Sequence, residues 1–421
     1  MQEALLQFVW RLQLFHNQVF TLSDGRKLLV LSPGRQNANQ GPDFLYARLE
    51  IDGIQWVGSV ECHIDGQSWY LHSHHKDSIY NSVILHVVLK KSTQIPCRKD
   101  GTEITELVVS LPEAILEKYQ QFLKTENSIP CSNFHSEIPP LLSYQWFTRL
   151  GVERFERKKD LWLQQKPSDI DYLDLLWRAT AEAIAGPINR QAFGEMAQHI
   201  PFSIIRQYRH QIIQLHALLF GVARLIPEKT TEDYPKILLQ EWHYLQQKHQ
   251  LTQLNTQCYF FRIRPIAFPT IRIAQLAAII QFEPYWQLTN PIIPNIDKQF
   301  LNQHIHHYWK THYIFEKETK LHNVSISDEV YNRLIINAFL PIQWSYFSKF
   351  NPDQIDYYLN LLEKIPPEQN QHTAKFKNLE FKPRCILHSQ GMIECITQYC
   401  QSQKCLECQF GQKILSPKTS Y

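Results

Sequence analysis

The sequence predicts an α+β protein in which a small N-terminal α/β domain, a helix plus a mixed sheet of hairpins, precedes a larger and mostly α-helical region. A chain of 421 residues is too long for one ordinary core and long enough for two domains. Residues 19–111 alternate short apolar runs with tight-turn signals, which is typical of strands. Beyond Pro139 the apolar residues recur at spacings of three and four, which is typical of helices.

The first element is predicted to be a helix over residues 2–16. Apolar residues in MQEALLQFVWRLQLF recur at helical spacing, and the segment lacks the basic start and cleavage site of a signal peptide. The chain has nine cysteines, and five of them fall between Cys385 and Cys408. An odd, clustered set argues against a secreted disulfide framework. We therefore expect a reducing compartment and a cytoplasmic location.

Residues 41–64, GPDFLYARLEIDGIQWVGSVECHI, predict two strands joined by a two-residue turn at Asp52-Gly53. In this register Leu49 faces Trp56, and one face is apolar on both strands. We expect that face in the core, with Glu61 and His63 sharing the polar face and opening toward a cleft. The apolar face comprises Leu45, Ala47, Leu49, Trp56, Val60 and Cys62.

Prolines and serines between residues 113 and 140 mark the boundary between the two domains. The predicted domains are residues 1–125 and residues 140–421, the second ending in the cysteine cluster. Its clearest element is a long helix over residues 205–226, with one apolar face. No apolar run is long enough to cross a membrane, so no membrane partner is expected.

Pro42-Asp43 at the start of one strand and Glu61-Cys62-His63 on the next resemble the PD-(D/E)xK nuclease superfamily. The resemblance implies a restriction-endonuclease-like N-terminal domain. It also implies that Asp43 and Glu61 bind Mg²⁺ or Mn²⁺, which activates water, with His63 in the position of the usual lysine. An imidazole lacks the fixed charge of lysine. In the ideal register Asp43 lies on the opposite face from Glu61, so the start of its strand has to bend or bulge.

Several histidines follow this segment, and two interpretations of them remain open. Imidazole and carboxylate groups together suit zinc, manganese or iron. The alternative is that they are polar loop residues, with His86 hydrogen-bonded inside the sheet. The residues concerned are His72, His74, His75, Asp77 and His86.

The C-terminal cysteines have the spacing Cys395-x4-Cys400-x4-Cys405-x2-Cys408. Closely spaced thiolates favour zinc or an iron–sulfur cluster, and the uneven spacing resembles the iron–sulfur loops of certain DNA-repair glycosylases and helicase-nucleases. The fourth ligand is open among Cys395, Cys385 and His388. The alternative is that these are free cysteines packed as small apolar groups.

Arginines gather around a predicted helix start at Pro269. Free backbone N–H groups there, together with Arg264 and Arg272, are candidates for binding phosphate. The alternative is that these arginines pair with carboxylates within the fold.

Six motifs spread along the chain resemble family 2851 of the bacterial domains of unknown function. They are GPDF, VECH, SWYLHSHHKDSIY with VILHVV, RPIAFPTIRIAQLA, YWKTHYIF and YCQSQKCLECQFG. That family is uncharacterised, so the resemblance implies no activity.

Two functional hypotheses follow from these residues. The first is a metal-dependent phosphodiesterase or nuclease acting on DNA or RNA, with Asp43, Glu61 and His63 as its catalytic residues. The second is a non-catalytic binding or scaffold protein that keeps a degenerate nuclease-like domain. The net charge of +3 is too small for bulk attraction of nucleic acid, so a local basic patch is required. The sequence does not predict an oligomeric state.

Overall fold

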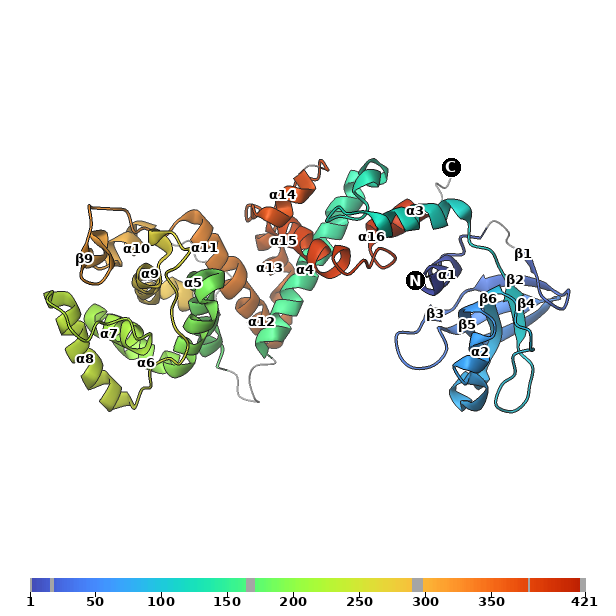
Figure 1. The fold of residues 1–421 in the computed structure, drawn as a ribbon, viewed down its shortest axis with the longest axis horizontal. Helices are drawn as coiled ribbons and strands as arrows, with labels where there is room; N and C mark the ends of the chain where they lie inside the picture. Colours follow the sequence, from blue (N-terminus) through green and yellow to red (C-terminus); the bar gives the residue numbers. More distant parts are fainter. Residues whose placement is uncertain (1, 16–18, 164–170, 290–297, 378, 417–421) are drawn as a thin grey trace. The chain divides into compact units, whose positions relative to one another are not determined.

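The fold was obtained as a computed structural model that describes residues 2–15, 19–163, 171–289, 298–377 and 379–416 (Figure 1). The chain divides into two compact units. The sheet unit comprises Met1–Phe147, Asn370–Lys382 and Met392–Tyr421. The helical unit comprises Thr148–Gln369 and Pro383–Gly391. The sequence predicts a single division near residues 125–140, whereas in the structure the C-terminal cysteine segment belongs to the unit that contains the N-terminal sheet.

The sheet unit begins with one helix and a mixed sheet, and helical segments from the C-terminal part of the chain complete it. The α-helices and strands are α1 (Gln2–Arg11), β1 (Val19–Thr21), β2 (Lys27–Ser32), β3 (Arg35–Gln36), β4 (Phe44–Ile51), β5 (Ile54–Asp65), α2 (Ser68–Leu71), β6 (Val83–Lys90), β7 (Thr105–Val108), α3 (Glu113–Lys124), α14 (Gln371–Lys377) and α16 (Gln409–Leu415). The single-turn and π-helical segments are η1 (His74–Lys76), η2 (Ser78–Ser82), η3 (Ser132–Glu137) and η9 (Cys395–Cys400).

The sheet has the strand order β1-β2-β4-β5-β6-β7, and β3 pairs with β4. Strands β5, β6 and β7 are parallel, and the other pairs are antiparallel. Because parallel neighbours need a crossover, the segment between β5 and β6 has to pass over one face of the sheet. That segment carries α2, η1 and η2.

One face of the sheet packs against α1 through a fully apolar core. Leu6 and Trp10 of α1 are completely buried there against residues of β4, β5 and β6. The helix ends at Arg11, five residues before its expected end, and His16 lies outside the described residues. The predicted α+β architecture, a helix with a mixed sheet followed by a larger helical region, is confirmed.

The predicted β4–β5 hairpin is confirmed, with Leu49 paired to Trp56 and Ala47 to Gly58. Beyond Ala47 the register shifts, so that Phe44 rather than Leu45 pairs with Val60. Tyr46 within this bulge has a φ of 60°, a left-handed conformation that is uncommon for a tyrosine. As a result Phe44 takes the core position, with no exposed surface, and Leu45 is only half-buried.

The expectation that Trp56 lies in the core is wrong, because 43% of its surface is exposed. Pairing of β6 with β5 starts only at Ser59, so Trp56 has a neighbouring strand on one side alone. The tip of the hairpin therefore extends past the core. Ala47, Leu49, Val60 and Cys62 are fully buried, as expected.

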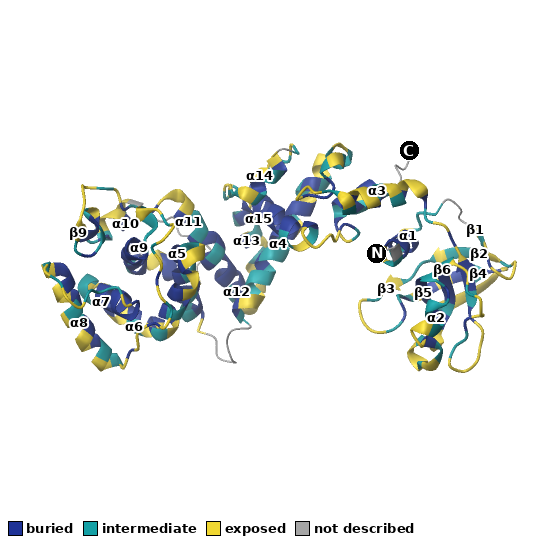
Figure 2. Cartoon of the chain, in the orientation of Figure 1, coloured by how far each residue is buried: buried dark blue, intermediate teal, exposed yellow. Residues whose placement is uncertain are grey.

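The helical unit is built around one extensive core of buried apolar side chains, shown dark blue along its helices in Figure 2. Its α-helices and strands are α5 (Tyr172–His199), α6 (Phe202–Tyr208), α7 (Ile212–Val222), α8 (Asp233–His249), α9 (Pro269–Gln281), α10 (Lys298–His304), β8 (His312–Ile314), β9 (Lys317–Glu318), α11 (Asp328–Leu334), α12 (Leu340–Phe350) and α13 (Ile355–Leu362). Its other segments are η4 (Pro265–Ala267), η5 (Glu283–Trp286), η6 (His307–Lys310), η7 (Ile335–Phe339) and η8 (Pro352–Gln354). The residues of α4 (Pro140–Leu163) and α15 (Ile386–Glu394) are divided between the two units.

The prediction of one continuous helix over residues 205–226 is wrong. Helix α6 ends at Tyr208 and α7 starts at Ile212, with a turn in which the amide of Gln211 donates to the carbonyl of Tyr208. Apolar spacing indicates which side chains are buried, but it does not detect a break in the helix at exposed polar residues such as His210. Among the described residues, no helix has the length and apolar character needed to span a membrane.

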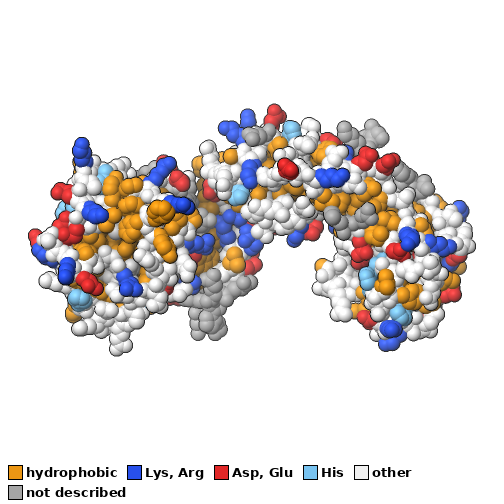
Figure 3. All heavy atoms as spheres, viewed as in Figure 1, with side chains coloured by type: hydrophobic (Ala, Val, Ile, Leu, Met, Phe, Trp, Pro, Cys, Tyr) orange, Lys and Arg blue, Asp and Glu red, His pale blue; other side chains and the backbone are white. Residues whose placement is uncertain are grey.

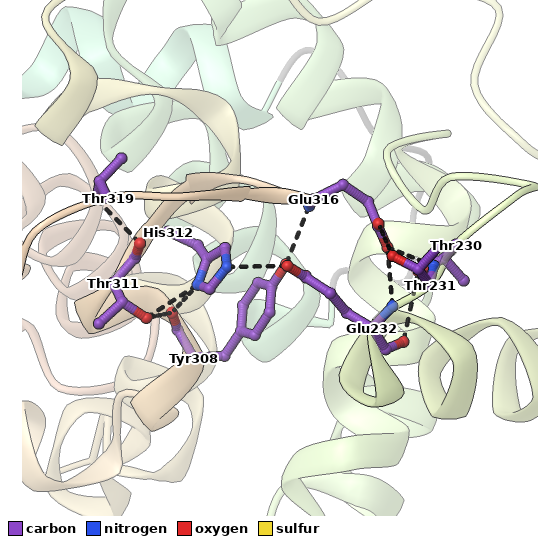
Figure 4. A network of polar contacts seen from close by, with 8 residues as sticks. All are labelled: Thr230, Thr231, Glu232, Tyr308, Thr311, His312, Glu316 and Thr319. Atoms are coloured by element: carbon purple, nitrogen blue, oxygen red, sulfur yellow. Dashed lines mark hydrogen bonds and ion pairs between the residues drawn. The ribbon is translucent and has the colours of Figure 1, made fainter.

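A polar network joins the small β8–β9 hairpin to the start of α8 (Figure 4). The carboxylate of Glu316 accepts hydrogen bonds from Thr230 and Thr231, and Nε2 of His312 lies 3.2 Å from Glu232. Tyr308 donates to Glu232 and accepts from the amide of Glu316. The polar groups of this network are hydrogen-bond partners of one another, which gives the network a structural role.

Candidate functional site

A row of polar residues crosses the three parallel strands of the sheet at one level. The strand register aligns Glu61 of β5 with His86 of β6, and His86 with Glu106 of β7. All three are buried, and His63 lies one step further along β5 on the same face. Buried polar side chains are retained only where they find partners, so their contacts define the site.

The crossover segment covers this row and contributes two more histidines. Trp69 of α2 is fully buried, and its ring lies 5.3 Å from that of His74 and 5.4 Å from that of His86. Ser73 adopts a left-handed conformation with a φ of 61°, which separates α2 from η1 and turns His72 and His74 toward the sheet. The expectation that Glu61 and His63 open toward a cleft is therefore wrong, because only 5% and 2% of their surfaces are exposed.

Four ligand-type atoms converge beneath the crossover. Nε2 of His63 lies 3.2 Å from Nδ1 of His72 and 3.7 Å from Oε1 of Glu61. Nε2 of His74 lies 3.5 Å from the same oxygen and is a buried nitrogen without a hydrogen-bond partner. The ligand atoms of His63, His72 and His74 all lie within 4.8 Å of one another. We call Glu61, His63, His72 and His74 the histidine cage.

A chain of contacts behind the cage orients His63. Its Nδ1 lies 2.9 Å from Nε2 of His86, and Nδ1 of His86 lies 3.5 Å from Oε2 of Glu106. Burial opposes ionisation of Glu106, but its contact with His86 and its hydrogen bonds from Ser92 outweigh it and lower the pKa of this carboxyl. An ionised Glu106 favours the proton of His86 on Nδ1, which favours that of His63 on its own Nδ1. In this arrangement the lone pair of His63 is on Nε2, on the side of the cage.

Asp43 adjoins the cage at the end of β4, where the bulge has brought it. Its amide donates to Oε2 of Glu61, and its carboxylate accepts from the amide of Cys62, both at 3.0 Å. Burial, the dominant cause, raises the pKa of Asp43 to about 6. Burial and then the charge of Asp43 raise the pKa of Glu61 to about 9. Within the described part of the chain, the charged groups that act on these two carboxyls are themselves carboxylates, which favours a nearby cation.

The geometry of the cage fits a divalent transition metal. Metal–ligand bonds of about 2.0 to 2.1 Å place the corners of a tetrahedron about 3.3 to 3.4 Å apart. The separation of 3.2 Å between His63 and His72, and those of 3.5 and 3.7 Å from Glu61 to His74 and His63, are close to that value, while the three histidines as a group lie within 4.8 Å of one another. Burial lowers the pKa of His63 to about 3 and that of His74 to about 4, so both rings are neutral near pH 7, as metal ligands must be. Three imidazoles with one carboxylate suit zinc, iron or manganese better than magnesium.

The structure places the cysteines of the sequence prediction together with one more. Cys395 contacts Cys400 and Cys408, while Cys131, which precedes η3, shares a small cavity with Cys400, Cys405 and Cys408. His388 has both ring nitrogens engaged, one by the amide of Arg384 and the other by the hydroxyl of Thr148.

The two arginines predicted to bind phosphate do not form one surface. Arg264 is exposed at the start of η4, whereas Arg272 is buried in α9 and donates to Gln275. Other cations of the helical unit line one open cavity of about 440 Å³, which we call the basic cavity, and Figure 3 shows Lys and Arg side chains gathered in a hollow there. They are Arg154, Arg157, Lys158, Arg190 and Arg333.

Sequence reasoning identified Asp43, Glu61 and His63 but assigned no definite role to the remaining cage residues. His72 and His74 lie in the crossover between the parallel strands β5 and β6. The sequence pattern in this region resembles hairpins, so it does not indicate the crossover. The signal for the basic cavity was the run VERFERKK in α4, whose charges also fit a solvated helix face.

Together these features define an α+β protein with a histidine-rich candidate metal centre on a mixed sheet. The chain belongs to the family described as "Protein of unknown function (DUF2851)", whose sequence model matches residues 3–371. The match includes the histidine cage, the basic cavity and Cys131, and it ends before the C-terminal cysteines. Comparison with curated proteins and with solved structures gives no significant match.

Proposed function

We propose that the protein is a divalent-metal-dependent hydrolase of phosphodiester bonds in nucleic acid, with its metal in the histidine cage. The observation that carries this proposal is that the ligand atoms of His63, His72 and His74 lie within 4.8 Å of one another, with Oε1 of Glu61 beside two of these histidines. The sequence pattern alone placed the metal between Asp43 and Glu61. The donor set moves it toward the imidazoles, with Glu61 common to both arrangements.

The surroundings of the cage supply the other requirements of such a site. His72 is exposed, so the cage faces solvent on its side and a large substrate can approach there. A divalent cation held in the cage supplies positive charge that stabilises a phosphodiester undergoing attack and activates water. Asp43 holds Oε2 of Glu61 through its amide, which leaves Oε1 directed toward the cage, and its carboxylate, with a pKa near 6, is suited to accept a proton.

The basic cavity supports nucleic acid as the substrate class. Five cations line it, Trp162 contributes an aromatic surface, and Glu182 is the single acidic residue among its lining residues. Burial lowers the pKa of Arg333 despite the nearby charges of Glu329 and Glu368, so desolvation disfavours its charge and a further anion would stabilise it. Phosphate groups meet this requirement, since arginine binds them through paired hydrogen bonds.

A matched pair of variants tests the proposal. His74→Gln removes a cage nitrogen, whereas His75→Gln alters the neighbouring residue of η1, which is not part of the cage. Each protein is stripped with chelator, reloaded separately with zinc, manganese, ferrous iron or magnesium, and assayed for metal content and for cleavage of single-stranded DNA, duplex DNA and RNA. We expect wild type and His75→Gln to bind metal and cleave, and His74→Gln to lose both.

Two outcomes contradict the proposal. Stoichiometric metal in wild type with no cleavage of any substrate would replace the hydrolase by the non-catalytic binding protein with a structural metal. Equal metal content and equal trace cleavage in all three proteins would remove the metal centre itself and identify the cleavage as contamination.

A further inference from the structure

Five cysteines from distant parts of the sequence meet in the sheet unit. Cys131 lies between α3 and η3, Cys395 and Cys400 begin and end η9, and Cys408 directly precedes α16. These four cysteines and the fifth, Cys405, are buried and have free thiols. This group is separate from the histidine cage and takes no part in the proposed hydrolysis.

Four of the five thiols surround a common opening. Cys131, Cys400, Cys405 and Cys408 line one small cavity. Gly411 also lines it, and a side chain there would meet the carbonyl oxygen of Cys405 at 2.0 Å. The close approach of α16 to the cysteine loop therefore requires glycine at this position. Cys395, 1% exposed, is not among the lining residues.

The spacing of these sulfur atoms distinguishes a single metal ion from a cluster. Zinc bound to four cysteines at about 2.3 Å would hold its sulfur atoms about 3.8 Å apart. Within the described part of the chain, no three cysteine sulfurs lie within 4.8 Å of one another. Four thiols that line one cavity, with no three sulfur atoms close enough together for a single ion, match a polynuclear iron–sulfur cluster, which is held by four cysteine thiolates on its periphery.

Cys395 has a different position from the other four. It is buried beside Cys400 and Cys408 but does not line the cavity, which leaves it outside the ligand set.

We propose that Cys131, Cys400, Cys405 and Cys408 bind an iron–sulfur cluster, with Cys395 outside the ligand set. The cluster joins the segment between α3 and η3 to the C-terminal segment. Of the ligands expected from the sequence, Cys395 is replaced by Cys131, which is distant in sequence and adjacent in space.

The full-length protein, purified without oxygen and reconstituted with ferrous iron and sulfide, tests this assignment. Wild type is expected to contain iron and acid-labile sulfide in equal amounts and to absorb broadly in the visible range. Cys131→Ser should lose most of both, and Cys395→Ala should keep both. Cys258→Ser, a buried cysteine of the helical unit, is the matched control and should equal wild type.

Wild type that contains zinc without sulfide would overturn the cluster, and this measurement does not depend on the folding of any variant. Cluster loss in Cys395→Ala with retention in Cys131→Ser would overturn the ligand set.

Discussion

The backbone amide of Asp43 donates a hydrogen bond of 3.0 Å to Oε2 of Glu61, and the side chain of Asp43 accepts one from the amide next to Glu61 in β5. The two carboxyls are thus fixed at the ends of neighbouring strands by each other's backbone. Their charges repel, since Asp43 is among the causes that raise the pKa of Glu61. The pair is held together by geometry against its electrostatics, which is a common property of metal-binding and catalytic carboxylates.

Replacing Asp43 separates its two roles. Asp43→Asn keeps an oxygen that can accept from the amide of Cys62 and removes the repelling charge, so metal-free stability should equal or exceed that of wild type. Asp43→Ala leaves the buried amide without a partner and should lower the free energy of unfolding by about 1 to 3 kcal/mol. Urea denaturation with chelator present measures both. An Asn variant as unstable as the Ala variant would contradict the repulsion.

Two tryptophans of the sheet unit should respond very differently to truncation. Trp69 is fully buried beside His74 and His86 and donates to the carbonyl of Cys97, so Trp69→Ala should cost about 3 to 5 kcal/mol. Trp56 is 43% exposed at the hairpin tip, so Trp56→Ala should cost about 1 kcal/mol or less. Chemical denaturation of both variants tests this. A similar cost for the two would mean that Trp56 is buried in solution.

The basic cavity makes a prediction about nucleic-acid binding that does not require cleavage. Arg157→Gln should weaken binding of DNA of any sequence and reduce the slope of log K against log salt by about one. Arg149→Gln on the same helix is the control, because Arg149 pairs with Glu153 and is absent from the cavity lining. Fluorescence anisotropy over a salt series measures both slopes. Equal slopes in the two variants would exclude the cavity as a phosphate site.

The buried His216 predicts a pH dependence of stability. Burial lowers its pKa to about 3, and its Nδ1 is hydrogen-bonded to the hydroxyl of Tyr234 at 2.6 Å. The unfolded residue titrates near its ordinary value of about 6.5, so the unfolded state binds the extra proton between that pH and the folded pKa. This contribution to stability is present above pH 6.5 and is lost as the pH falls. His216→Gln should flatten the decrease in stability between about pH 6.5 and 4, as followed by denaturation at several pH values.

The parts of the fold that were predictable from sequence depend on local signals. The Asp52-Gly53 turn fixed the pairing of Leu49 with Trp56, because a two-residue turn specifies the register by itself. The bulge at Tyr46 was not predictable in detail, since it depends on the neighbouring strand, although the need for one followed from the position of Asp43. A local sequence pattern predicts that buried and exposed residues alternate along a strand. The position at which a bulge interrupts this alternation depends on the neighbouring strands of the assembled sheet.

The candidate site shows the same limit over longer distances. Glu61 and His63 share a strand, so their proximity was predictable, whereas the covering by His72 and His74 depends on the parallel pairing of β5 with β6. Cys131 could not be grouped with Cys400 from sequence, because no periodicity links residues so far apart.

The discontinuity of the sheet unit has a consequence for the order in which the protein forms during synthesis. The segment from residue 392 onward, which completes that unit, leaves the ribosome after the long segment 148–369 of the helical unit. Cys131 is synthesised before the helical unit, whereas Cys400, Cys405 and Cys408 are synthesised after it. Nascent chains should therefore acquire protease resistance in the helical unit first, and a chain arrested before residue 392 should carry a folded helical unit beside an incomplete sheet unit.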